Sequence, residues 1–216
     1  MIRVCVVCEG QTEVEFVKSC LAPYLLHSQV QAFPSLLQSP SGNHRGGRVT
    51  IERLVRFMSH QYHQTDRITT LVDFYGFQDR EGRSRAQLEA EVQARLAGIK
   101  GYDPRFVLPY VQMYEFEGLL FSDPEAFAWV EDGWSEEARQ ALVAVNRAFA
   151  SPEEINDSIE TAPSKRLLNI FSAGSYSKTE HGPLIAESIG IEAIRAKCPA
   201  FDEWVGKMQA WGHQAG

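Results

Sequence analysis

The chain has 216 residues, of which 44% are hydrophobic and 23% charged, and its formal net charge at pH 7 is −7. This composition is typical of a globular protein and excludes a largely disordered chain. The negative charge excludes a general electrostatic attraction to nucleic acid, so any phosphate contact must come from a local patch. The apolar run at residues 4–8 is too short for a signal peptide or a membrane span, and we expect a cytoplasmic protein with no membrane contact.

The first segment, "IRVCVVC" at residues 2–8, is apolar and rich in β-branched side chains, as in a strand that is covered on both faces. It stops at Glu9, and a helical pattern follows at once. Thr12 and Glu15 have the spacing of a capping box, and Pro23 is expected to bend or end the helix. A strand, turn and helix in this order would place Glu9 at the carboxyl end of a sheet, where α/β proteins usually bind their ligands.

The next elements alternate in the same way. Apolar runs predict strands near residues 30–37, 67–73 and 105–114, and apolar residues at helical spacing predict helices near 51–62 and 88–99. Alternation of strands and helices predicts parallel strands joined by right-handed crossovers. We therefore expect an α/β fold in which helices flank a mostly parallel, Rossmann-like sheet.

The pattern changes past residue 124, where Pro or acidic residues open a series of helical segments and no convincing strand occurs. We divide the chain into an α/β core at 1–123 and a C-terminal helical lobe at 124–216 that packs on the core. The four cysteines are expected to be buried free thiols, since an odd separation on one strand sends Cys5 and Cys8 to opposite faces of the sheet.

Two acidic residues, Glu9 and Asp73, each end a predicted strand. The carboxyl ends of parallel strands meet at one edge of a sheet, so both side chains should emerge there. Carboxylate oxygens suit Mg²⁺ or Mn²⁺, which proteins usually hold with one or two carboxylates plus substrate phosphate. The simpler interpretation is that each acid caps a helix or a turn.

Several short blocks carry a resemblance to known families. The turn "EGQTE" and the later "LVDFYG" resemble the TOPRIM fold of topoisomerases, primases and OLD-family nucleases. The blocks "EGQTE", "DFYG", "YEFEGLLF", "PEEIN", "TAPSKRL" and "YSKTEHGPLIAESIG" together are similar to the DUF4276 family of uncharacterised bacterial proteins, grouped with TOPRIM-like domains. This second resemblance runs over almost the whole chain and brings no established activity.

The TOPRIM resemblance implies metal binding by a strand-end glutamate and by a later DxD pair. The glutamate falls on Glu9 and the first aspartate on Asp73, but position 75 is Tyr, which puts two-metal cleavage in doubt. Asp79 would substitute only if its loop folds back. Glu117, or else Glu115, follows the fourth predicted strand and is the better candidate for a third acid.

Basic residues would contact a phosphate. Lys178 and Lys165 are predicted in loops between helices, where a cation can neutralise a phosphate oxygen, although each can equally be a solvated surface residue. Arg45 and Arg48 belong to the cationic loop "GNHRGGR", which would either close over a phosphate or simply be mobile. We assign Lys178 a catalytic role and the other three a phosphate-binding role.

These assignments favour a Mg²⁺- or Mn²⁺-dependent phosphodiesterase or nuclease, with Glu9 either binding the metal or acting as general base. The sequence contains no Walker A loop, no GxGxxG after the first strand and no GxSxG elbow, which weakens the competing enzyme classes. Its partner would be nucleic acid or a nucleotide phosphate. The alternative is a non-catalytic interaction module that docks a partner protein, in a bacterial defence or mobile-element context.

Overall fold

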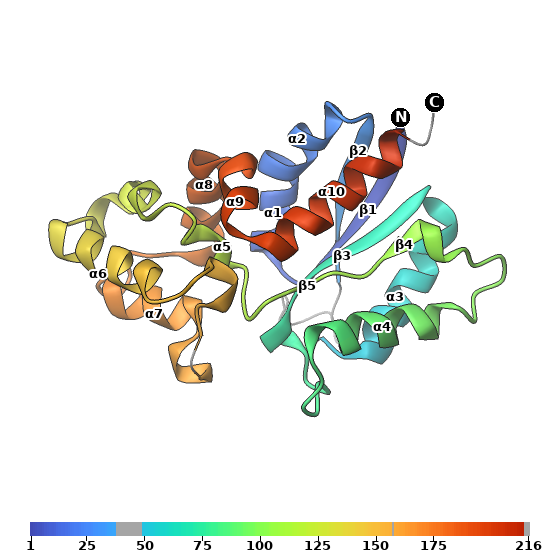
Figure 1. Cartoon of the computed structure of the whole chain (residues 1–216), viewed down its shortest axis with the longest axis horizontal. Coiled ribbons are helices and arrows are strands. Elements are labelled where there is room, and N and C mark those ends of the chain that lie inside the picture. Colours follow the sequence, from blue (N-terminus) through green and yellow to red (C-terminus); the bar gives the residue numbers. More distant parts are fainter. Residues whose placement is uncertain (38–48, 157, 214–216) are drawn as a thin grey trace.

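The described residues, 1–37, 49–156 and 158–213 of a computed structural model, form a five-stranded parallel sheet (Figure 1). Its central strands are β1 (Ile2–Cys8) and β3 (Arg67–Asp73), with β2 (Val30–Leu36) beside β1. The other edge comes from β4 (Val107–Leu108) and β5 (Val111–Gln112), both paired with β3. The predicted α/β fold with parallel strands is confirmed.

The last predicted strand is divided in two by Pro109, which corrects the single strand expected from the sequence. Proline has no N–H to donate to a neighbouring strand, so the ladder is interrupted there. The Thr70 hydroxyl bridges the gap, since Oγ1 accepts from Tyr110 N at 2.7 Å and donates to Tyr110 O at 2.7 Å. The strand pairing resumes one residue later, and this carries the chain to the carboxyl end of β3.

The first helix continues through Pro23 without ending there. α1 (Gln11–Phe16) passes into a π-helical turn at Val17–Leu21 and then into α2 (Ala22–Leu26). Pro23 has no N–H, so it could not donate a helical hydrogen bond in any case. The wider turn before it therefore costs no hydrogen bond at that position. The predicted bend is therefore a local widening of the helix.

Helices cover both faces of the sheet. α3 (Ile51–Gln61) and α4 (Arg85–Leu96) pack on the face that carries Cys5, while α1, α2, α8 (Lys178–Ile189), α9 (Ile191–Lys197) and α10 (Pro199–His213) pack in the core on the face that carries Cys8 (Figure 1). Alternating side chains of β1 thus enter two separate cores. All four cysteines are free and buried, as expected.

After residue 123, the regular elements within residues 124–156 and 158–213 are helices and none is a strand, as predicted. α6 (Glu136–Arg147) and α7 (Pro163–Ile170) lie beside the sheet, next to the short α5 (Glu117–Leu120) (Figure 1). α10 instead returns to the sheet, where Trp204 stacks on Tyr110 with ring centroids 4.5 Å apart and donates from Nε1 to Thr69 Oγ1 at 2.7 Å. The segment after residue 123 therefore supplies both the helices beside the sheet and part of the cover on its face.

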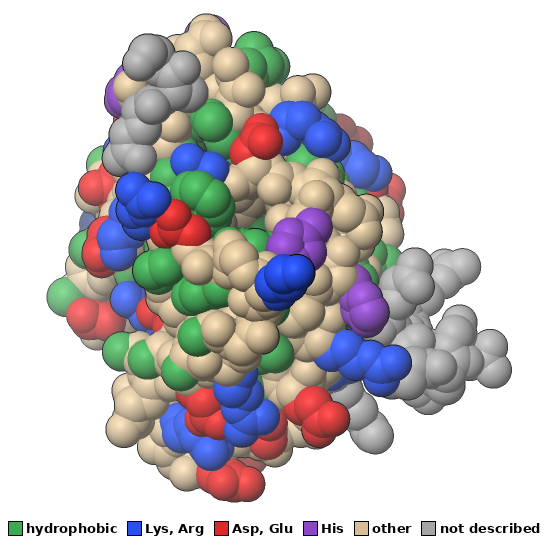
Figure 2. Space-filling view, turned by 90° about the vertical axis from the view of Figure 1, so that its right-hand side faces the viewer, with side chains coloured by type: hydrophobic (Ala, Val, Ile, Leu, Met, Phe, Trp, Pro, Cys, Tyr) green, Lys and Arg blue, Asp and Glu red, His purple; other side chains and the backbone are tan. Residues whose placement is uncertain are grey.

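The surface turned away from α6 and α7 carries acidic and basic side chains interspersed with one another (Figure 2). In the part of the chain that the structure describes, no helix has the length and apolar character needed to cross a membrane.

Candidate functional site

A cavity of about 590 Å³ opens at the carboxyl edge of the sheet. Its walls come from the ends of β1, β2 and β3, from the first turns of α1 and α8, and from α5. The lining residues are Glu9, Gly10, Gln11, Thr12, Glu13, Leu36, Asp73, Glu117, Lys178 and Thr179. Four of them are acids and one is a lysine, and the parallel topology is what brings them together from distant parts of the chain.

Glu9 follows the last residue of β1 and turns its carboxylate toward the end of β3. Its Oε2 accepts a hydrogen bond from Asp73 N at 3.1 Å, although 64 positions separate the two residues in sequence. Gly76 packs against the same carboxylate, and a Cβ at that position would lie 2.2 Å from Glu9 Oε2. Burial raises the pKa of Glu9 to about 6, against the opposing effects of the Asp73 N–H and Lys178.

Asp73 is the last residue of β3, and its Oδ1 accepts from Phe116 N at 2.8 Å. Burial raises the pKa of Asp73 well above its usual range, and the charges of Glu13, Glu9 and Glu117 raise it further. These effects show that the carboxylates in the cavity are close enough to repel one another. A cation bound there would relieve this repulsion.

Glu13 is a site residue that the sequence analysis missed. The predicted capping box of Thr12 and Glu15 is wrong, because the N-cap is Gly10, two residues earlier, and Glu13 Oε2 accepts from Gly10 N at 2.8 Å. Glu13 is 7% exposed, and its burial, with the charges of Glu9 and Glu117, raises its pKa to about 7. The available signal was its position three residues after the glycine of the turn, which is the capping-box spacing.

Lys178 forms an ion pair with Glu117, with Nζ and Oε1 3.0 Å apart. Glu117 is only 2% exposed, and its burial raises its own pKa while Lys178 lowers it. Burial lowers the pKa of Lys178, but Glu117 and Glu115 outweigh this effect and the net pKa is raised, so the lysine is charged. Lys178 is the first residue of α8 and does not lie in a loop between helices, as the sequence had suggested.

Two acids near the site have other partners. Asp79 accepts from Ile51 N, with the shorter distance 3.1 Å, and so it holds the start of α3 and does not substitute for a second metal-binding aspartate. Glu115 accepts from Ser164 N at 2.8 Å, at the start of α7. Tyr75 occupies the position of the second acid, and its hydroxyl accepts a hydrogen bond from the Asn156 side chain. Within the described ranges, then, Glu117 is the third predicted acid that reaches the cavity.

The basic residues assigned to phosphate binding do not join Lys178 in the cavity lining. Lys165 is exposed on α7. Arg45 and Arg48 lie outside the described residues.

The acids provide oxygen atoms that suit a hard divalent cation. Glu9 and Asp73 each accept one hydrogen bond through one carboxylate oxygen, and no hydrogen bond to the other oxygen occurs among the described residues. Within residues 1–37, 49–156 and 158–213, no three His, Cys, Asp or Glu side chains are grouped so that they would hold an ion together. A Mg²⁺ or Mn²⁺ ion at this edge would be held by one or two protein carboxylates, with the remaining positions left to water and phosphate.

Comparisons with known proteins give one family and two solved structures. No curated protein matches the sequence. Two solved structures, both of the C-terminal region of the Xanthomonas campestris pv. campestris OLD protein, are similar over most of their length. One was phased with iodine (TM-score 0.47, 13% identity, 98% of this chain and 96% of that chain covered) and one with platinum (TM-score 0.44, 14% identity, 100% and 98% covered). A family model described as a domain of unknown function, DUF4276, matches residues 8–209, and the chain therefore belongs to that family.

Proposed function

We propose that this chain is a Mg²⁺- or Mn²⁺-dependent phosphodiesterase that acts on nucleic acid or on a nucleotide phosphate. The observation that carries the proposal is the meeting of Glu9 and Asp73. They arrive from the ends of two neighbouring parallel strands, line one cavity with Lys178, and each keep a carboxylate oxygen without a hydrogen bond among the described residues. The resemblance of "EGQTE" and "LVDFYG" to TOPRIM domains agrees with it.

Glu9 and Asp73 would hold the cation. When bound, such an ion lowers the pKa of a coordinated water and neutralises charge on a phosphate. Lys178, held by Glu117, would place its ammonium group beside a phosphate oxygen and offset the charge that develops during substitution at phosphorus. Glu9 is the alternative proton acceptor, because its raised pKa of about 6 is closer to neutral pH than that of an ordinary glutamate.

Titration calorimetry with Mn²⁺ tests the proposal. We expect the native protein to bind Mn²⁺ and the Glu9→Gln and Asp73→Asn variants to lose at least about tenfold in affinity. Asp79→Asn is the matched control, because it makes the same change just beyond β3, retains an oxygen for Ile51 N and should bind Mn²⁺ as the native protein does. Hydrolysis of bis(p-nitrophenyl) phosphate should follow the same order of variants.

A second candidate is the non-catalytic interaction module, which would dock a partner protein. It is favoured by exposed apolar side chains on the helical lobe, where Trp129 and Leu168 are each 49% exposed and Ile159 is 56% exposed. Absence of Mn²⁺ binding by the folded native protein would contradict the phosphodiesterase and leave this candidate.

A further inference from the structure

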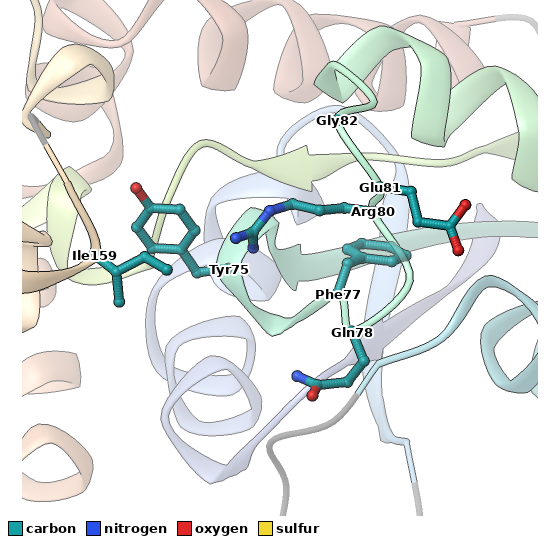
Figure 3. Close-up of a pocket in the computed structure, with 7 residues that line it drawn as sticks. All are labelled: Tyr75, Phe77, Gln78, Arg80, Glu81, Gly82 and Ile159. Atoms are coloured by element: carbon teal, nitrogen blue, oxygen red, sulfur yellow. The ribbon is translucent and has the colours of Figure 1, made fainter.

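A second cavity, of about 560 Å³, lies next to the turn that follows β3 (Figure 3). This volume is within the usual range for small-molecule sites. The turn and its continuation supply one side, and Ile159 of the helical lobe supplies the other. The lining residues are Tyr75, Phe77, Gln78, Arg80, Glu81, Gly82 and Ile159.

Arg80 reaches across this cavity toward the ring of Tyr75 (Figure 3). Its guanidinium carbon lies 5.1 Å from the centroid of the Tyr75 ring and 5.5 Å from that of Phe74. Among the described residues, the guanidinium group makes no hydrogen bond and no ion pair. Its N–H donors are therefore available to a ligand, while the group itself lies over the Tyr75 and Phe74 rings.

The Tyr75 ring is held in place before any ligand binds. Its hydroxyl accepts from Asn156, its backbone N–H donates to Tyr114 O at 3.1 Å, and the Tyr114 ring centroid lies 5.4 Å away. Tyr114 itself adopts a φ of 60°, a left-handed conformation that is uncommon for a tyrosine. An aromatic surface fixed in this way loses little conformational entropy when a flat ligand stacks on it.

The same short turn lies next to the acidic cavity, although its residues 74–76 do not line it. Gly76 packs on the Glu9 carboxylate, Asp73 ends the strand before the turn, and Tyr75 between them lines the second cavity. A ligand with a phosphate at Glu9 and Asp73 that extends past Gly76 would bring its neighbouring group to Tyr75 and Arg80. A nucleotide has this form, since a flat, hydrogen-bonding base is attached to a phosphate through one sugar.

We propose that the cavity between Tyr75, Arg80 and Ile159 is a nucleobase subsite, in which a base from a mononucleotide or from an unpaired nucleic-acid strand stacks on the Tyr75 ring and the Arg80 guanidinium. This inference rests on the proposed function, because it names the substrate class of the same catalytic edge. Aromatic rings and arginine planes are the usual surfaces for unpaired bases. Ile159 would form the apolar wall that excludes water from the base.

Fluorescence anisotropy with two labelled hexanucleotides of identical length and charge would test the subsite. One is oligo-dT and the other carries abasic sites, and both are measured in EDTA so that no cleavage occurs. We expect the native protein to bind oligo-dT at least about fivefold more tightly than the abasic strand, as stacking of a single base would produce. Arg80→Gln and Tyr75→Leu should abolish this preference, while Tyr75→Phe, which retains the ring, should keep it. Competition by dTMP distinguishes a mononucleotide from a strand as the source of the base.

Mn²⁺ titration of the same variants separates this inference from the proposed function. Arg80→Gln and Tyr75→Leu should bind Mn²⁺ as the native protein does, because neither side chain lines the acidic cavity. Equal affinity of the native protein for both strands would overturn the subsite even if Mn²⁺ binds. A preference for oligo-dT that persists in both variants would also overturn it. A preference that disappears in the two variants, in a protein that binds no Mn²⁺, would support the subsite and contradict the phosphodiesterase.

Discussion

Two groups of acids have limited access to solvent but differ in how many hydrogen bonds their carboxylate oxygens accept. One is Glu153, and the other is the pair of Glu9 and Asp73. Both oxygens of Glu153 accept from backbone N–H groups at the start of α10, Oε2 from Ala200 at 2.9 Å and Oε1 from Phe201 at 3.0 Å. Glu9 and Asp73 each accept one such bond. The carboxylate of Glu153 thus completes the fold, since it supplies acceptors that the helix end lacks.

The cavity acids are placed by the fold but do not complete it. Their single hydrogen bonds fix each carboxylate, and burial raises the pKa of each. Such an arrangement destabilises the folded protein unless a proton or a cation is bound, which is common at functional sites. Burial alone therefore does not separate a structural acid from a functional one, whereas the number of satisfied oxygens does.

Glu153→Ala should have the largest effect and should distinguish the structural acid from the cavity acids. The change removes both acceptors from the start of α10, and we expect the free energy of unfolding to fall by about 2 kcal/mol. Urea denaturation measures this loss, and Mn²⁺ titration of the folded variant should show native affinity. A variant as stable as the native protein would mean that Glu153 is not structural.

Gly76→Ala should affect the metal site. Its Cβ would lie 2.2 Å from Glu9 Oε2, so the carboxylate must move, and we expect Mn²⁺ affinity to fall by about tenfold. Gly98→Ala is the matched control, since its Cβ would meet only Arg95 O at an ordinary 3.7 Å. Calorimetry on both variants gives the comparison, and equal affinities would show that the position of Glu9 is unimportant for the ion.

The smallest effect concerns pH and Glu13. Its pKa rises from 4.5 to about 7 on folding, so the folded chain binds more protons than the unfolded chain between these values, and stability is lost as pH rises through this window. Without metal, Glu13→Gln should therefore raise the free energy of unfolding at pH 8 by on the order of 1 kcal/mol and leave it unchanged at pH 4.

Glu15→Gln, two residues along the same helix, is the control for this prediction. Glu15 contacts Lys18 at the surface and has a lowered pKa, so its removal should bring no gain at pH 8. Thermal unfolding of both variants in EDTA at the two pH values measures the difference. A gain of equal size in the two variants would trace the effect to overall charge and not to the cavity.

The sequence was sufficient to predict the topology and the meeting of Glu9 with Asp73. Long apolar runs and a repeated strand–helix order are compatible with few arrangements other than a parallel sheet. It was insufficient where a single local hydrogen bond determines the position of a side chain. The bond from Gly10 N to Glu13 places the helix start earlier than predicted, so Glu13 was not recognised as a site residue. The bond from Ile51 N to Asp79 holds Asp79 away from the metal-binding role considered for it. Lys178 was placed in a loop because the flanking Gly174, Tyr176 and Gly182 suggested a turn, yet Gly182 is buried within α8.

The position of α10 has a consequence for how the protein forms. Thr69 lies on the central strand β3, and Tyr110 lies between β4 and β5 at the edge of the sheet. Trp204, which is 135 residues later than Thr69, donates to the Thr69 hydroxyl and covers the Tyr110 ring. Contacts of such long sequence separation form slowly, because the loop entropy must be lost first. Lys178 likewise joins the acidic cavity only after residues 1–177 have been made. A nascent chain on the ribosome would accordingly lack the complete site until Lys178 and Trp204 have been made, so that whatever chemistry the cavity performs cannot begin earlier.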